Sequence, residues 1–210
     1  MLGVTWGKTI YSVITQLPCI HGKEISVIQM AGNFKLQNPA TDSRALVPQI
    51  ASLYNGTYHF LDAPLYIKDS ALKSALMSEP GIQDTLSLAR TMDIVLTGIG
   101  GLSSLPIHNP VFAPYVTPAD FGHEEDCIGS LYGYVLDRNG EIADIPLNQK
   151  VIAAPMEHIL LTEHRLAVVY GRHKAKITAM AMKRQLINEI LTDMDTARML
   201  LHHAQSGSSS

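Results

Sequence analysis

The segment from residue 168 to residue 201 limits the possible folds of this chain more than any other. An apolar run ending at Val168 and Val169 is followed by Gly171, three basic or titratable side chains and a helical pattern of alanines and methionines. A second apolar run covers residues 186–191, residues 192–195 resemble a helix cap, and a last helix covers residues 196–202. Strand, helix, strand and helix in this order predict a βαβα unit with a parallel sheet.

Length and composition favour a single α/β domain. The chain has 210 residues, which is enough for one well-buried domain and too short for two ordinary ones. Hydrophobic residues make up 46% and charged residues 17%, as expected for a sheet covered on both faces. We expect residues 1–204 to form the domain and residues 205–210 to be a linker-like tail.

Charge and hydropathy exclude two classes of partner for this segment. The net charge is −3 and lysine and arginine form no block, whereas nucleic-acid binding needs clustered positive charge. No apolar run is long enough to span a bilayer, and no charged signal region precedes the first strand. We therefore expect a cytoplasmic protein that does not contact a membrane.

Strand and helix patterns alternate along the rest of the chain. The predicted architecture is a three-layer, Rossmann-like α/β sandwich with a mostly parallel sheet. Residues 102–121 are rich in proline and are expected to be a lid or disordered. One strand, 128–137, is expected to end in an Asn139-Gly140 turn and to pair with residues 142–145. Further strands are predicted at 2–4, 24–30, 58–61 and 93–101, and helices at 8–17, 43–54, 69–78, 82–92 and 155–160.

Several predicted strands end in small residues, where open α/β sheets bind ligands. The first turn, residues 5–9, offers two threonine hydroxyls, a lysine and N–H groups at a helix start, which can cradle a phosphate or a sugar. The turn before the helix at 175 offers Lys174 in a similar position. Residues 31–33 and 98–101 are the other small-residue loops at this edge.

Other chemistries have little support in the spacing of the polar residues. The nine histidines show no pair with a third ligand at zinc spacing, so no metal is expected, and the two cysteines are expected to be reduced thiols. A nucleophile elbow, a Walker loop and a complete GxGxxG are absent, so no cofactor is expected. An acid–base pair for sugar isomerisation could combine Lys174 with Asp62, Glu124 or Asp126, but no spacing singles out one of them.

Six motifs together resemble the effector-binding domain of the SorC family of bacterial sugar-responsive transcriptional regulators, over roughly residues 2–201. They are LGVTWGKTIY (2–11), VIQMAG (27–32), LDAPL (61–65), DIVLTGIGGL (93–102), IGSLYGYVLDRNGEI (128–142) and HKAKITAMAMKRQLINEILTDMDTARMLL (173–201). The resemblance implies a fold related to phosphosugar isomerases and deaminases. It also implies a sugar or sugar-phosphate effector, assembly into dimers or tetramers, and operator DNA bound by an N-terminal helix-turn-helix that is not in this sequence.

The resemblance also implies which residues bind the effector. The family's phosphate-holding loop matches Thr5, Trp6, Gly7, Lys8 and Thr9, its second-strand loop matches Gly32 and Asn33, its glycine loop matches Gly98, Gly100 and Gly101, and its effector-contacting lysine matches Lys174.

Two positions depart from the family pattern. Many relatives carry Gly-Asp where this chain has Gly129-Ser130, and Gly-Gly where it has Tyr170-Gly171. A changed polar partner usually means a changed ligand, because an unpaired buried hydroxyl costs about 1–3 kcal/mol. We include Ser130 in the expected site, and Asp126 as a possible source of the missing carboxylate.

Three functions remain open from the sequence. The leading hypothesis is a regulatory effector-binding and oligomerisation domain without catalytic residues. The alternatives are a phosphosugar isomerase or deaminase on the same fold, and an oligomerisation domain that has lost its ligand.

Overall fold

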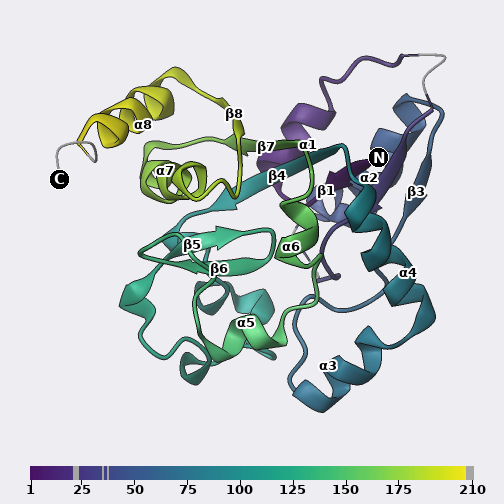
Figure 1. The fold of residues 1–210 in the computed structure, drawn as a ribbon, viewed down its shortest axis with the longest axis horizontal. Coiled ribbons are helices and arrows are strands. Elements are labelled where there is room, and N and C mark those ends of the chain that lie inside the picture. Colours follow the sequence, from purple (N-terminus) through teal and green to yellow (C-terminus); the bar gives the residue numbers. More distant parts are fainter. Residues whose placement is uncertain (21–23, 35, 37, 207–210) are drawn as a thin grey trace.

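A computed structural model describes residues 1–20, 24–34, 36 and 38–206 (Figure 1). In this part of the chain, six strands form a parallel sheet and helices cover both of its faces, which confirms the predicted three-layer α/β fold. The order across the sheet is β3 (Thr57–His59), β2 (Ser26–Gln29), β1 (Leu2–Val4), β4 (Ile94–Gly100), β7 (His164–Val169) and β8 (Glu189–Thr192).

The strand order reverses between β1 and β4. From β1 the chain continues to β2 and β3 on one side, and it then returns to place β4, β7 and β8 on the other side. Loops that leave neighbouring strands in opposite directions open a crevice at the carboxyl ends of those strands. The loop after β1 and the end of β4 therefore face a common space.

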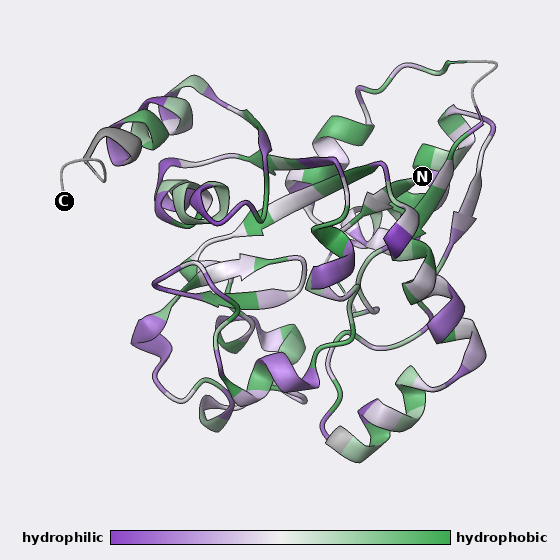
Figure 2. Ribbon diagram, viewed as in Figure 1, coloured by the Kyte–Doolittle hydropathy of each residue, from purple (hydrophilic) through white to green (hydrophobic). Residues whose placement is uncertain are grey.

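Alternating apolar residues in the strands fix the two helical layers. Val4, Leu96 and Val168 pack with α1 (Lys8–Ile14) and α2 (Ser43–Leu53) on one face. Val95 and Ala167, one residue out of phase, pack on the other face with α6 (Met156–Ile159) and α7 (Ala175–Lys183). Figure 2 shows hydrophobic residues running through the central strands, whereas the outer helices carry both hydrophobic and hydrophilic residues. Burial on both faces explains why these strands are almost continuously apolar.

A second, smaller core lies below the carboxyl end of β4. Strand β5 (Cys127–Leu131) pairs antiparallel with β6 (Tyr134–Asp137), and it also pairs with the last two residues of β4. The hairpin packs with α5 (Pro146–Lys150) and the proline-rich segment 102–121.

The remaining helices are α3 (Ser70–Met77), α4 (Pro80–Leu88) and α8 (Met194–Ser206). Short 3₁₀ turns lie at Pro39–Thr41, Ala89–Thr91, Leu102–Ser104, Pro106–His108, Pro110–Phe112, Pro118–Asp120, Glu124–Asp126 and Arg172–Lys174.

The predicted single strand at 128–137 is wrong, because the chain reverses in its middle. Tyr132 and Gly133 have φ values of 57° and 97°, the left-handed pair that a tight two-residue hairpin turn requires. The Asn139-Gly140 turn does form, but residues 142–145 return only through one bridge, between Leu136 and Ile142.

Two other expectations change in detail. The proline-rich segment 102–121 is a series of 3₁₀ turns that buries Leu105, Phe112 and Phe121, so it is a packed wall of the second core. The βαβα unit at the end of the chain is confirmed, but β8 begins only at Glu189 because Leu186 and Ile187 are buried in the core.

The predicted tail at 205–210 is only partly covered by the structure. Helix α8 continues to Ser206, and residues 207–210 lie outside the described residues. Figure 1 shows α8 beside α7 at the edge of the molecule. No helix within the described ranges has the length and apolar character needed to cross a membrane.

Asn148 joins α5 to the hairpin with a fully used side-chain amide. Its oxygen accepts from the Val135 N–H at 2.9 Å, and its nitrogen donates to the carbonyls of Val135 at 2.9 Å and Ala143 at 2.7 Å. The side chain is buried and acts like an extra strand partner for β6. Removing it would break three hydrogen bonds and leave the Val135 N–H without a partner among the described residues, whereas the carbonyls of Val135 and Ala143 would keep the N–H groups of Ala143 and Ile145 as donors.

We therefore predict that Asn148→Ala lowers the free energy of unfolding by about 2–4 kcal/mol. Urea denaturation would measure the change, with Asn139→Ala as the control because that side chain is exposed and should cost less than about 1 kcal/mol. Equal losses from the two variants would contradict this role for Asn148.

Candidate functional site

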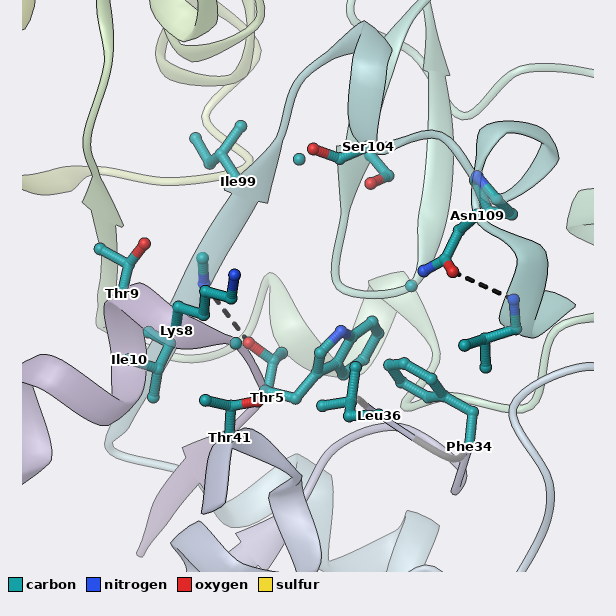
Figure 3. Close-up of a pocket in the computed structure, with 18 of the residues that line it drawn as sticks. Thr5, Lys8, Thr9, Ile10, Phe34, Leu36, Thr41, Ile99, Ser104 and Asn109 are labelled. Atoms are coloured by element: carbon teal, nitrogen blue, oxygen red, sulfur yellow. Dashed lines mark hydrogen bonds between the residues drawn. The ribbon is translucent and has the colours of Figure 1, made fainter. Parts of the chain in front are cut away.

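A cavity of about 570 Å³ lies between the carboxyl ends of β1 and β4 and the second core. Its position is the crevice that the strand order predicts, and its volume lies within the range of about 300–1,000 Å³ that is usual for ligand sites. Figure 3 shows Thr5, Lys8 and Thr9 of the first loop around the same space as Ser104 and Phe34. The predicted site residues among its lining are Thr5, Trp6, Gly7, Lys8, Thr9, Gly98, Gly100, Ser130 and Lys174.

The loop after β1 is fixed to β4 by a small network of hydroxyls. The Thr5 hydroxyl donates to Thr97 Oγ1 at 3.2 Å and accepts from the Gly98 N–H at 3.4 Å. Gly7 has a φ of 126°, which favours glycine, and its N–H donates to the Thr41 carbonyl. Thr5 therefore positions the loop, and Lys8 and Thr9 are left to meet a ligand.

Glycines at the end of β4 let two other segments approach closely. A Cβ on Gly100 would lie 2.4 Å from Ser130 Oγ, and one on Gly101 would lie 3.3 Å from the ring of His173 and 3.5 Å from Lys174 Cγ. Gly101 itself does not line the cavity, but it lets Lys174 reach it. Ser130 gives the cavity a hydroxyl.

The polar end of the cavity has an excess of positive charge. Burial lowers the pKa of the Lys174 ammonium below its usual value. Among the described residues, neither Lys8 nor Lys174 makes an ion pair, and the lining contains no aspartate or glutamate. A desolvated ammonium without a counter-ion favours an anionic ligand.

The other end of the cavity is aromatic. Trp6 and Phe34 meet edge to face with ring centroids 4.9 Å apart, and Phe112 lies 4.8 Å from Phe34 and 5.2 Å from Tyr66. All four side chains line the cavity, and Leu36 lies beside them (Figure 3). The cavity thus joins a cationic, hydroxyl-rich end to an apolar one.

Besides Gly101, three predicted residues lie outside the lining for clear structural reasons. A Cβ on Gly32 would lie 2.5 Å from the Pro64 carbonyl, so this glycine serves packing. The Asn33 side chain accepts from Gln29 at 2.8 Å and donates to the Leu61 carbonyl at 3.4 Å. Asp126 is exposed and pairs with Arg138 at 3.2 Å, so it does not supply the cavity with a carboxylate.

Sequence reasoning missed the residues that the loops contribute. Asn38 and Thr41 come from the connection before α2, and Ser103, Ser104, His108 and Asn109 come from the proline-rich segment. The only available signal was the run of polar side chains between prolines in a loop long enough to cover a site. His108 lies at the rim and pairs with Glu124 at 2.7 Å.

Comparison with known proteins gives related regulators. Over 146 residues the chain is 27% identical to the transcriptional regulator LsrR of Escherichia coli O139:H28; this stretch is 68% of the chain and 46% of that protein. The chain therefore spans about half the length of the curated relative.

Solved structures share the fold. A structure described as "Putative Sugar-Binding Domain of Transcriptional Repressor from Vibrio fischeri" superposes with a TM-score of 0.84 at 24% identity, covering 98% of this chain and 81% of that one. The full-length sorbitol operon regulator SorC from Klebsiella pneumoniae gives a TM-score of 0.84 at 20% identity, covering 95% and 64%.

A family model described as "Putative sugar-binding domain" matches residues 1–202. This match covers almost the whole chain and agrees with the motifs that resemble SorC-type regulators. The protein therefore belongs to this sugar-binding domain family.

Proposed function

We propose that this domain binds a phosphorylated sugar as the effector of a transcriptional regulator. The observation that carries the proposal is Lys174, a half-buried ammonium with no acidic partner in the described part of the chain, which lines the cavity between the carboxyl ends of β1 and β4. Family membership and the regulators among the relatives support the regulatory role. The predicted site residues in the lining are proposed to make the contacts.

The charge of the cavity favours a phosphorylated sugar over a free one. Hydroxyls of a free sugar need acceptors, and carboxylates are the strongest ones that side chains offer. Within the described residues the lining has none, whereas it has two lysines and the hydroxyls of Thr9, Ser104 and Ser130. Ammonium and hydroxyl groups are suitable donors for phosphate oxygens.

The proposed regulation needs the rest of the protein. We propose that operator DNA is bound by an N-terminal helix-turn-helix outside this sequence, and that the effector shifts the equilibrium between oligomers in the cytoplasm. The effector can do so only if its affinity differs between the two states. The aromatic end of the cavity belongs to the second core and the cationic end does not. A movement of one core relative to the other would therefore change the affinity for the effector.

The two alternatives have less support. An isomerase or deaminase needs a base that reaches the substrate, but no carboxylate lines the described cavity, and His108 is engaged with Glu124. A domain without a ligand would gain nothing from Lys174, a half-buried ammonium that lines the cavity and has no acidic partner among the described residues, because an unpartnered buried charge costs stability.

A thermal-shift screen of this domain against matched free and phosphorylated pentoses, hexoses and ketoses would test the proposal. A ligand at about 100 times its Kd should add about 2.7 kcal/mol to stability. We expect only phosphorylated members to stabilise the protein, and Lys174→Met to weaken binding by about 10- to 100-fold, since a charged hydrogen bond is lost.

Lys176→Met is the matched control, because Lys176 is exposed two residues further on and does not line the cavity. It should leave the affinity unchanged. Conversion of a phosphosugar to product would show that the domain is an enzyme, and preference for free sugars would refute the assignment of the ligand class.

The pH dependence of binding should report Lys174 directly. Its protonated form pairs with the phosphate, and burial lowers its pKa below the usual 10.5, so affinity should fall as pH rises and begin to fall before an ordinary lysine would titrate. Below about pH 6 the phosphate itself gains a proton and affinity should fall again. Isothermal titration calorimetry across this range would measure the profile. The alkaline decline should disappear in Lys174→Met, and its persistence there would assign the decline to another group.

A further inference from the structure

We propose that the aromatic end of the cavity is a second subsite, which takes a flat apolar group attached to the phosphorylated sugar. This inference rests on the proposed function, because the cationic end would hold the phosphate. It goes further in stating that the ligand is a phosphorylated glycoside with an aromatic substituent and not a simple sugar phosphate.

The wall of this subsite is continuous, and the described side chains that form it are uncharged. Trp6, Phe34 and Phe112 follow one another at centroid distances of 4.9 Å and 4.8 Å, with interplanar angles of 80° and 44°. Tyr66 extends the wall, but its hydroxyl donates to the Gly133 carbonyl, and burial raises its pKa, so it stays neutral. The rings therefore offer apolar surface to whatever occupies this end.

Part of this aromatic surface is open to a ligand. Phe112 and Tyr66 are buried in the second core, whereas Trp6, Phe34 and Leu36 are only half-buried and line the cavity. Figure 3 shows Phe34 and Leu36 together, across the cavity from Ser104. Half-buried large apolar side chains grouped in a cavity mark a site for an apolar group.

A sugar ring alone does not match this end. Each hydroxyl placed against the wall would lose its water partners and find few acceptors, which lowers affinity. The nearby amides of Asn38 and Asn109 use their oxygens to accept from the N–H groups of Ala40 and Val111, so mainly their N–H donors remain. A ring with few hydroxyls, bearing at most an acceptor atom at its edge, fits these surroundings.

The two ends are close enough for one ligand. Trp6, in the loop after β1, and Lys8, the first residue of α1, are two positions apart, and both line the same cavity. The volume of about 570 Å³ is in the range of sites that enclose drug-sized molecules, so there is room for an aromatic ring beside a sugar phosphate.

The test compares 4-nitrophenyl and methyl glycosides of the same phosphosugars, namely glucose 6-phosphate, galactose 6-phosphate and ribose 5-phosphate. Trp6 is the single tryptophan of the sequence, so its emission reports on the subsite without labelling. We expect the nitrophenyl member of at least one pair to bind at least about tenfold more tightly than the methyl member, as burial of an aromatic ring predicts, and to quench Trp6 emission.

Phe34→Ala should bring the nitrophenyl member to within about threefold of the methyl member. Leu36→Ala should act in the same direction, and it keeps the test valid if the first variant is poorly folded. Phe60→Ala is the control, because Phe60 is a half-buried aromatic residue outside the cavity lining.

The outcomes separate the two proposals. If methyl glycosides bind and lose affinity in Lys174→Met, but the nitrophenyl members bind no more tightly, the subsite is refuted and the proposed function stands. If no phosphosugar of either kind binds, both fail. If the nitrophenyl preference survives in Phe34→Ala and Leu36→Ala, the aromatic group binds elsewhere and the subsite is wrong.

Discussion

The close approach of two backbones at the end of β4 joins the parallel sheet to the hairpin of the second core. A Cβ on Gly129 would lie 2.2 Å from the Gly100 carbonyl oxygen, and the φ of Gly129 is 148°, so a glycine is required here on both counts. The contact lets β4 pair with β1 and β7 through its first residues and with β5 through its last two. One strand thus belongs to the parallel sheet and also carries the hairpin of the second core, and the cavity lies where the two meet.

The chemistry of the cavity follows from this junction. The first core ends in loops with free hydroxyls and ammonium groups, since strand ends in a parallel sheet leave backbone and side-chain donors without partners. The second core contributes aromatic side chains that its own packing only partly covers. A cavity between two cores of different composition therefore has two chemically different ends.

Sequence patterns were sufficient for the alternation of strands and helices and for most of the strand ends that line the cavity. The βα order, the loop at residues 5–9, the glycines at 98–101 and Lys174 could all be found in this way. The hairpin was missed because its turn uses Tyr132 with a positive φ, a conformation that an aromatic residue rarely adopts and that no local pattern indicates. The aromatic wall was missed because Phe34, Tyr66 and Phe112 come from distant loops, and only long-range packing brings them together.

The position of Asp126 shows the same limit at short range. It lies four residues before Ser130, yet its carboxylate points to Arg138 because it belongs to a 3₁₀ turn that precedes β5. Separation along the chain was a poor guide to separation in space at the entrance of a strand.

The presence of two cores has a mechanical consequence. Strand pairing between β4 and β5 joins them, and the hairpin also packs Ile128, Leu131 and Tyr132 into the core of the parallel sheet. The cavity between the two cores is open. A molecule that contacts both ends of this space would act as a non-covalent crosslink, restraining the hairpin relative to the parallel sheet and making the two cores unfold more nearly as one cooperative unit.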